Sequence, residues 1–202
     1  MKNYIETSSK MSSKGTSSVK ELSYRTSYLD SEERWSLVIL GKETGNRPKL
    51  RYAWLVAWLI IGAVVVMEAD RLGTDEDVRM ILMVFMAFWA YYLYKILRAV
   101  RWYQVGKEML MMKGDLLLHK NSYGEIGRTR EYDLSMVRPM MMRQPTEGFA
   151  SLFEDSFWSN GIGSIELPIA AHSLLIGKRL SEKESEQVIA RFNKELKKRV
   201  GK

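Results

Sequence analysis

The chain has 202 residues, a formal net charge of +7 and a pI near 9.5. This length holds one moderate domain or two small ones, and the positive charge fits attraction to an anionic membrane surface. No nucleic-acid-binding motif accompanies the charge, so we expect no nucleic-acid partner. The absence of cysteine excludes disulfides, thiolate chemistry and cysteine-ligated metal centres.

The first part of the chain is polar. Residues 1–29 are rich in serine, threonine and lysine, and with so little apolar surface to bury they are predicted to form a disordered tail. Residues 30–49, which precede the first long apolar run, are predicted to form a juxtamembrane segment. Its local structure has two interpretations. Asp30 and Glu33 have the spacing of a capping box, which favours a short helix in the headgroup region. The sequence WSLVIL at 35–40 also fits a buried strand that pairs with the later domain.

Two apolar runs, residues 52–67 and 80–94, dominate the middle of the chain. The first carries no charge and would rise about 24 Å as a helix, slightly less than the roughly 30 Å of a hydrocarbon core. Arg51 can extend this span by snorkelling. Two buried helices of a soluble core would be the alternative, but uncharged runs of this length on both sides of a short connection favour a transmembrane helical hairpin over residues 50–102.

Charged residues around the two runs predict the orientation of the hairpin. Lysine and arginine dominate the segments before the first run and after the second, whereas acidic residues dominate the connection. The positive-inside rule therefore places both termini on the cytoplasmic side of the cell membrane. The residues expected at the membrane interface are Arg51, Trp54, Tyr94, Arg98, Arg101 and Trp102.

The acidic connection contains Asp75, Glu76 and Asp77, which have two interpretations. Carboxylates bind divalent cations, but the spacing matches no calcium loop. Thr74 followed by Asp77 fits the start of a helix, where negative side chains are stabilised by the helix dipole. We favour capping and predict no metal site.

Residues 103–202 have the pattern of a small α+β domain. Residues 108–119 predict a β-hairpin with its turn at 113–115, and a further strand is expected over 126–137. Other candidate strands are 140–142, 153–158, 162–167 and 173–176. Ser181 and Glu184 form a capping box before an amphipathic helix. Such a helix would cover the open side of a curled antiparallel sheet or barrel.

Three sequences carry a resemblance to a known class of domain: GKEMLMMKGDLLLH at 106–119, TREYDLSMV at 129–137 and LLIGKRLSEKESEQVIARFNKEL at 174–196. Together they resemble bacterial pleckstrin-homology-like (PH-like) domains. The layout is most similar to small membrane proteins in which two transmembrane helices precede such a domain. The resemblance implies a β-barrel capped by a helix and used for binding, with no catalytic residues to carry over.

No nucleophile elbow, acid–base pair or metal-ligand spacing emerges, so we predict a protein that is not an enzyme and has no cofactor. His119 and His172 are each expected to face solvent or the core. The candidate partner surface is a methionine run between two arginines, because methionine adapts to irregular apolar surfaces. An edge strand with one methionine pointing inward is the alternative. The surface comprises Arg138, Met140, Met141, Met142 and Arg143.

These features predict a membrane-anchored, non-catalytic interaction or assembly protein. Its partners would be the lipid bilayer and a membrane or cytoplasmic protein, and homo-oligomers are left open. One alternative is an accessory subunit of a larger membrane complex with the hairpin as the interface, since Gly62 and Ala63 allow close helix approach. Another is a lipid-headgroup-binding module.

Overall fold

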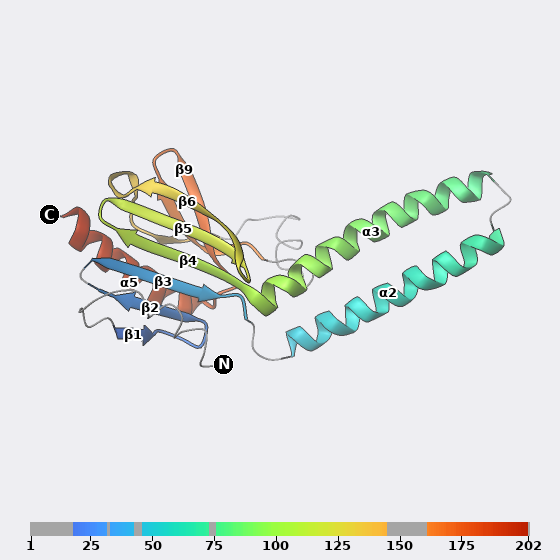
Figure 1. Ribbon diagram of the computed structural model, residues 1–202, viewed down its shortest axis with the longest axis horizontal. Helices are drawn as coiled ribbons and strands as arrows, with labels where there is room; N and C mark the ends of the chain where they lie inside the picture. Colours follow the sequence, from blue (N-terminus) through green and yellow to red (C-terminus); the bar gives the residue numbers. More distant parts are fainter. Residues whose placement is uncertain (1–17, 32, 43–45, 73–75, 145–160, 202) are drawn as a thin grey trace.

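The computed structural model describes residues 18–31, 33–42, 46–72, 76–144 and 161–201. A β-domain lies at one end of the molecule, and a long helical hairpin projects from it (Figure 1). In chain order the elements are β1 (Ser18–Glu21), β2 (Thr26–Asp30), β3 (Arg34–Leu40), α2 (Arg47–Leu72), α3 (Glu76–Val105), β4 (Gly106–Lys113), β5 (Leu116–Tyr123), β6 (Ile126–Asp133), the 3-10 helix η1 (Leu134–Met136), β7 (Met141–Met142), β8 (Gly163–Ile169), β9 (His172–Lys178) and α5 (Glu182–Val200).

The larger sheet is an antiparallel meander of six strands in the order β1-β2-β3-β4-β5-β6. Strands β3 and β4 pair along their length, from Arg34 opposite Lys113 to Leu40 opposite Lys107. Because α2 and α3 lie between β3 and β4 in the chain, the helical hairpin is the connection between two neighbouring strands of one sheet. The β-domain is therefore assembled from segments on both sides of the hairpin.

This arrangement corrects the expectations for the first part of the chain. Residues 18–21 and 26–29 were predicted within a disordered tail, but they belong to the strands β1 and β2. Of the two interpretations of residues 30–49, the strand is the one that the structure shows, over residues 34–40. The polar strand β2 is held by contacts with α5, because Arg191 stacks on Tyr28 at 4.3 Å from the ring centroid and forms an ion pair with Asp30. Residues 1–17 lie outside the described residues.

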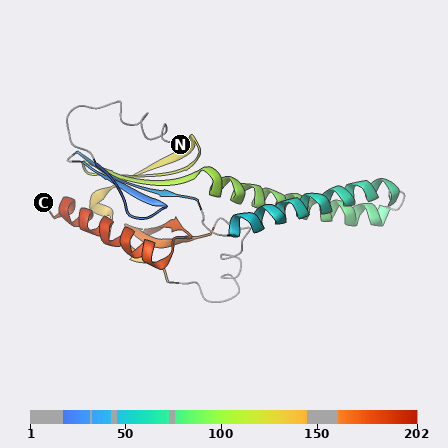
Figure 2. The same cartoon turned by 90° about the horizontal axis from the view of Figure 1, so that it is seen from below.

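A second layer covers one face of the six-stranded sheet, as Figure 2 shows. It consists of the sheet β7-β8-β9 and the helix α5, which begins with the predicted capping box of Ser181 and Glu184. Trp35 from β3 meets Phe192 from α5 edge to face, with ring centroids 5.9 Å apart. The core between the layers comprises Trp35, Leu37, Ile39, Leu110, Met112, Leu117, Leu134, Val137, Met140, Ile165, Leu167, Ile169, Ile176, Leu180, Val188, Phe192 and Leu196.

The expected α+β architecture is thus present, with two differences in detail. The described strands form two separate sheets, so the larger sheet does not close into a barrel. The strand predicted over 126–137 ends at Asp133, whose side chain accepts a hydrogen bond from the backbone N–H of Ser135 at 2.9 Å and so caps η1. The predicted β-hairpin over 108–119 is confirmed by the pairing of β4 with β5, and the candidate strand at 153–158 lies outside the described residues.

The two helices of the hairpin are long and apolar enough to cross a membrane. Only 11% and 6% of their most apolar windows are buried within the protein, whereas a core helix of a soluble protein would be mostly buried. The 30 residues of α3 rise about 45 Å, which exceeds a hydrocarbon core of roughly 30 Å. A membrane of that thickness would therefore leave one end of α3 outside its apolar layer. Glu76 and Asp77 occupy its first turn, while Thr74 and Asp75 lie outside the described residues.

The hairpin is held together by two tryptophans. The indole N–H of Trp89 donates to the carbonyl oxygen of Trp58 at 2.9 Å, and the indole N–H of Trp58 donates to the carbonyl oxygen of Trp89 at 3.2 Å. Gly62 allows this approach, because a Cβ at that position would lie 2.2 Å from the Trp89 ring. The close helix contact predicted from Gly62 is therefore made within the hairpin itself.

Candidate functional site

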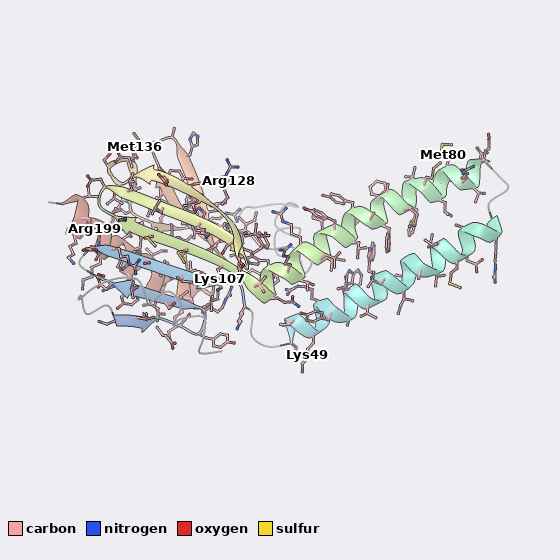
Figure 3. All side chains as sticks on the ribbon, viewed as in Figure 1. Lys49, Met80, Lys107, Arg128, Met136 and Arg199 are labelled. Carbon is pink, nitrogen blue, oxygen red and sulfur yellow. The ribbon has the colours of Figure 1, made fainter. Side chains whose placement is uncertain are left out.

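The candidate site lies where the hairpin meets the β-domain. We call this region the neck and define it as residues 96–105 of α3, the first turn of α2 and the adjoining ends of β3, β4 and β5. Figure 3 shows Lys49 and Lys107 at this end of the hairpin and Met80 at the opposite end. Helix α3 ends at Val105 and β4 begins at Gly106, so no linker separates helix from strand.

The junction is closely packed around one tryptophan. Trp102 is 1% exposed and meets Tyr123 of β5 edge to face, with ring centroids 5.1 Å apart. A Cβ at Gly41 or at Gly106 would lie within 2.4 Å of the carbonyl oxygen of Trp102. The backbone N–H of Gly41 donates to the carbonyl oxygen of Gly106 at 2.8 Å, which closes the β3–β4 ladder against the helix. These contacts fix the direction in which α3 leaves the sheet.

A pocket of about 170 Å³ opens beside this junction, between the start of α2, the end of α3 and the turn before β2. Its most enclosed cation is Arg51, which is 2% exposed and lies 3.8 Å from the centroid of the Tyr103 ring. The side-chain amide of Gln104 donates to the hydroxyl of Tyr52. The pocket is lined by Tyr24, Lys42, Pro48, Arg51, Tyr52, Val100, Tyr103 and Gln104. We call it the neck pocket.

Behind the neck, a buried carboxylate links the two sheets. Glu108 of β4 is 1% exposed, and its Oε2 accepts a hydrogen bond from the backbone N–H of Gly177 in β9 at 2.7 Å. Burial raises the pKa of this carboxyl group, although the positive charges of Lys178 and Arg25 act in the opposite direction. Lys178 also lies over the Trp102 ring, with Nζ 4.1 Å from the centroid. A chain of charged and aromatic contacts therefore runs from α3 into the interior of the domain.

Arg25 anchors the first two strands to the same region. Its guanidinium donates to the carbonyl oxygens of Leu40, Lys178 and Arg179 at distances of 3.1, 3.1 and 2.8 Å. These acceptors belong to the last residue of β3, the last residue of β9 and the connection that follows β9. Arg25 lies in the segment predicted as a tail, and its hydrogen bonds therefore connect the ends of both sheets.

His119 lies on the inner face of β5. The sequence alone left open whether this side chain faces the core or solvent. It is 6% exposed and sits opposite Leu110. Burial lowers its pKa to about 4, and the charges of Arg130 and Lys178 act in the same direction. The imidazole is therefore neutral at physiological pH. Glu108 pairs with Asn121 rather than with His119, so the carboxyl and the imidazole are diagonal neighbours in the sheet and not an adjacent acid–base pair.

The residues predicted at the membrane interface fall into two groups. Trp54 and Tyr94 are exposed on the hairpin, as are Arg98 and Arg101. Arg51 and Trp102 are instead buried against other residues of the chain, so neither side chain is exposed as the membrane-interface prediction implies. Arg51 packs on Tyr103, and Trp102 packs against Tyr123. The last turns of α3 bury one face against the β-domain, and this packing covers Trp102.

The predicted partner surface is also divided by the structure. Met141 and Met142 are 50% and 36% exposed on the short edge strand β7, and Arg138 is exposed nearby. The assignment of Met140 to this surface is wrong, because its side chain is 3% exposed and belongs to the core. Its backbone N–H donates to Asn193 Oδ1 at 2.7 Å, and its carbonyl oxygen accepts from Nδ2 of the same side chain at 3.0 Å. Arg143 is half-buried.

The neck pocket was not predicted from the sequence, because its walls come from segments far apart in the chain. The available signal was the strand pattern of residues 35–40 together with Gly41 and Gly106, which face each other at one end of the β3–β4 ladder. Chemically, the pocket offers cations, hydroxyls and aromatic faces, which suit binding and orientation. Comparison of the chain with protein-family models, with curated proteins and with solved structures returned no match.

Proposed function

We propose that this chain is a membrane-anchored, non-catalytic interaction or assembly protein that presents a PH-like β-domain to a membrane or cytoplasmic protein partner. The observation that carries the proposal is the insertion of the apolar hairpin between the paired strands β3 and β4. Since α3 continues directly into β4, the anchor holds the domain at a fixed height and orientation. A flexible tether would only raise the local concentration of the domain.

The proposed location is the cytoplasmic face of the cell membrane. Strands before the hairpin and elements after it belong to one β-domain, so both ends of the described chain lie on the same side of the hairpin (Figure 1). Basic residues flank the hairpin on this side, and acidic residues lie at its tip. The positive-inside rule then favours the cytoplasm for the domain.

The proposed partner surface is the β7 edge, defined as Met141 and Met142 together with Arg138. Met141 and Met142 are both exposed on a short edge strand, where successive side chains point to opposite faces, so they offer adaptable apolar contacts on both faces of this edge. Arg138 adds a positive charge at the end of this contact. The arrangement favours a protein partner with an apolar patch bordered by acidic groups.

The test is quantitative co-purification in a mild detergent with a tag on the full-length chain. Met141→Ser combined with Met142→Ser removes the apolar contact without touching the buried Met140. Covering two partly exposed methionines contributes on the order of 1–2 kcal/mol, so recovery of the partner should fall about tenfold. Met136→Ser is the matched control, since Met136 is 55% exposed but lies outside β7.

Equal partner recovery with the double variant and with the wild-type chain would refute the β7 edge as the binding surface. The alternative of an accessory subunit that binds through its hairpin is tested by exchanging the hairpin for an unrelated one. Gly62 no longer supports that alternative, because Trp89 of the same chain already occupies the space above it.

A further inference from the structure

The neck pocket lies at the depth where the chain leaves the apolar layer. A hydrocarbon core of roughly 30 Å takes about 20 helical residues. Counted from Met80 along α3, such a span ends near Val100, and counted back from Ala69 along α2, it ends near Leu50. Val100 and Arg51 both line the pocket. The pocket therefore opens at the level of the lipid headgroups on the side of the β-domain.

The lining of the pocket has the chemistry of an anion site. Lys42 and Arg51 contribute two positive charges, and none of the described lining residues is acidic. Arg51 is fixed by its stacking on Tyr103, so its charge stays at the pocket wall. The positive end of the α2 dipole lies at the same wall, beside Pro48. Each of these features lowers the free energy of a bound anion.

The size of the pocket restricts the ligand. Sites for drug-sized molecules and cofactors measure about 300–1,000 Å³, whereas this pocket measures about 170 Å³. It holds a single small group with room for a few contacts. Tyr24 and Tyr52 are among its lining residues, and a tyrosine hydroxyl can donate a hydrogen bond to a phosphate oxygen.

We propose that the neck pocket binds the phosphate of an anionic phospholipid headgroup. Lys42 makes the ionic contact, Arg51 supplies a fixed positive charge, and the tyrosines orient the phosphate oxygens. The lipid is favoured over a soluble phosphate ester because the opening lies at headgroup depth. A bound lipid would fill the space between α2, α3 and the turn before β2, and would fix the hairpin against the β-domain.

The experiment uses the full-length chain, stripped of lipid in a neutral maltoside detergent and then supplied with phosphatidylglycerol or phosphatidylcholine at equal concentrations. Native mass spectrometry counts the lipids retained on each chain. A third arm adds inorganic phosphate at millimolar concentration as a soluble competitor. Lys42→Gln removes one charge, Lys42→Arg restores it, and Lys49→Gln is the matched control. Lys49 is exposed at the same end of α2 but does not line the pocket.

We expect one phosphatidylglycerol to be retained per chain in preference to phosphatidylcholine. Lys42→Gln should weaken this retention about fivefold, the effect of removing one lysine near an anionic surface. Lys42→Arg should restore it, and Lys49→Gln should leave it unchanged. Lys42 is half-buried in a connecting segment, so equal thermal unfolding of the variants in phosphatidylcholine would show that the fold is intact.

Three results would overturn the proposal. Equal weakening by Lys42→Gln and Lys49→Gln would show diffuse attraction, and no preference for the anionic lipid would show that the site does not exist. Displacement of the lipid by inorganic phosphate, dependent on Lys42, would assign the pocket to a soluble phosphate ester. Protein-partner recovery through the β7 edge is measured separately, so failure of the lipid site leaves the proposed function standing.

Discussion

The insertion of the hairpin into the sheet predicts which pieces of this chain fold alone. One piece is residues 103–202, which contains every element after the membrane segment. The other is a spliced chain in which an Asn-Gly turn replaces residues 42–105 and joins Gly41 to Gly106. These two residues already face each other across the β3–β4 ladder with a 2.8 Å hydrogen bond, and a two-residue turn suits such a connection. We expect the spliced chain to fold and residues 103–202 to remain unfolded.

The magnitude follows from the side chains that β3 contributes to the core. Trp35, Leu37 and Ile39 are 0%, 0% and 3% exposed. Removal of such side chains costs about 3–5 kcal/mol for the tryptophan and about 2–5 kcal/mol for each aliphatic residue. The sum, roughly 7–15 kcal/mol, equals the whole stability of a typical domain, which is about 5–15 kcal/mol. By contrast, no hairpin residue belongs to the core between the layers, so the splice leaves that core complete.

The assay is urea denaturation of both chains in detergent-free buffer, followed by far-ultraviolet circular dichroism and tryptophan fluorescence. The spliced chain should give a single cooperative transition, and the Trp35→Ala variant of it should lose about 3–5 kcal/mol. Residues 103–202 should show no transition. A cooperative transition of that fragment with the same midpoint as the spliced chain would refute the conclusion that β3 is part of this domain.

The remaining predictions concern the hairpin and the buried titratable groups. Gly62→Ala should destabilise the hairpin by about 1–3 kcal/mol because its methyl group displaces Trp89; unfolding in mixed detergent measures this, with the lipid-facing Ala63→Val as a near-neutral control. The pKa of His119, about 4 in the fold against an ordinary 6.5, means that stability present above pH 6.5 falls as the pH drops toward 4. The loss reaches about 3 kcal/mol, and His119→Gln should flatten this acid limb. Burial raises the pKa of Glu108, so ionisation of this carboxyl group lowers the stability of the fold as the pH rises. Glu108→Gln should therefore stabilise the domain more at pH 8 than at pH 5. A larger gain in stability at pH 5 would contradict the burial of an ionised carboxylate.

The hairpin and the terminal helix were predictable because their signals are local. Uncharged runs of the required length identify membrane-spanning helices without reference to any other segment. In the same way, Ser181 and Glu184 form the observed capping box, and the apolar positions 188, 192 and 196 face the core. The pairing of β4 with β5 was also predictable, since the two strands are joined by a short turn at Gly114.

The strands before the hairpin were not predictable from composition. Strand β2 is polar, and what holds it is a set of specific contacts: Arg25 with three carbonyl oxygens, Arg191 with Asp30, and Ser23 with Glu184. Each contact joins residues that are far apart in the chain or depends on a fold that is already assembled. A composition rule measures only apolar content, so it assigned this segment to the tail.

The burial of Arg51 and Trp102 was not predictable for a different reason. Arginine and tryptophan are typical both of membrane interfaces and of cation–aromatic contacts in a core, so residue type does not distinguish the two environments. The length of α3 bears on the distinction, because a helix of 30 residues is about ten residues longer than a hydrocarbon core requires and would extend past an apolar layer of that thickness. Trp102 lies in that extension and Arg51 faces it, and both are therefore covered by the domain.

In the proposed membrane-anchored state, the same insertion couples the folding of the domain to the membrane. Strand β3 is synthesised before the hairpin and β4 after it, so their pairing closes a loop from Gly41 to Gly106. The entropy of closing so long a flexible loop opposes pairing by roughly 4 kcal/mol. A hairpin that has formed in the membrane brings the two ends together (Figure 1), and the Asn-Gly turn of the spliced chain does so without a membrane. We therefore expect the spliced chain to refold from urea in buffer alone, whereas the full-length chain should regain its native tryptophan fluorescence only when detergent or lipid is present. Refolding of the full-length β-domain at the same rate with and without lipid would show that closure does not depend on the hairpin.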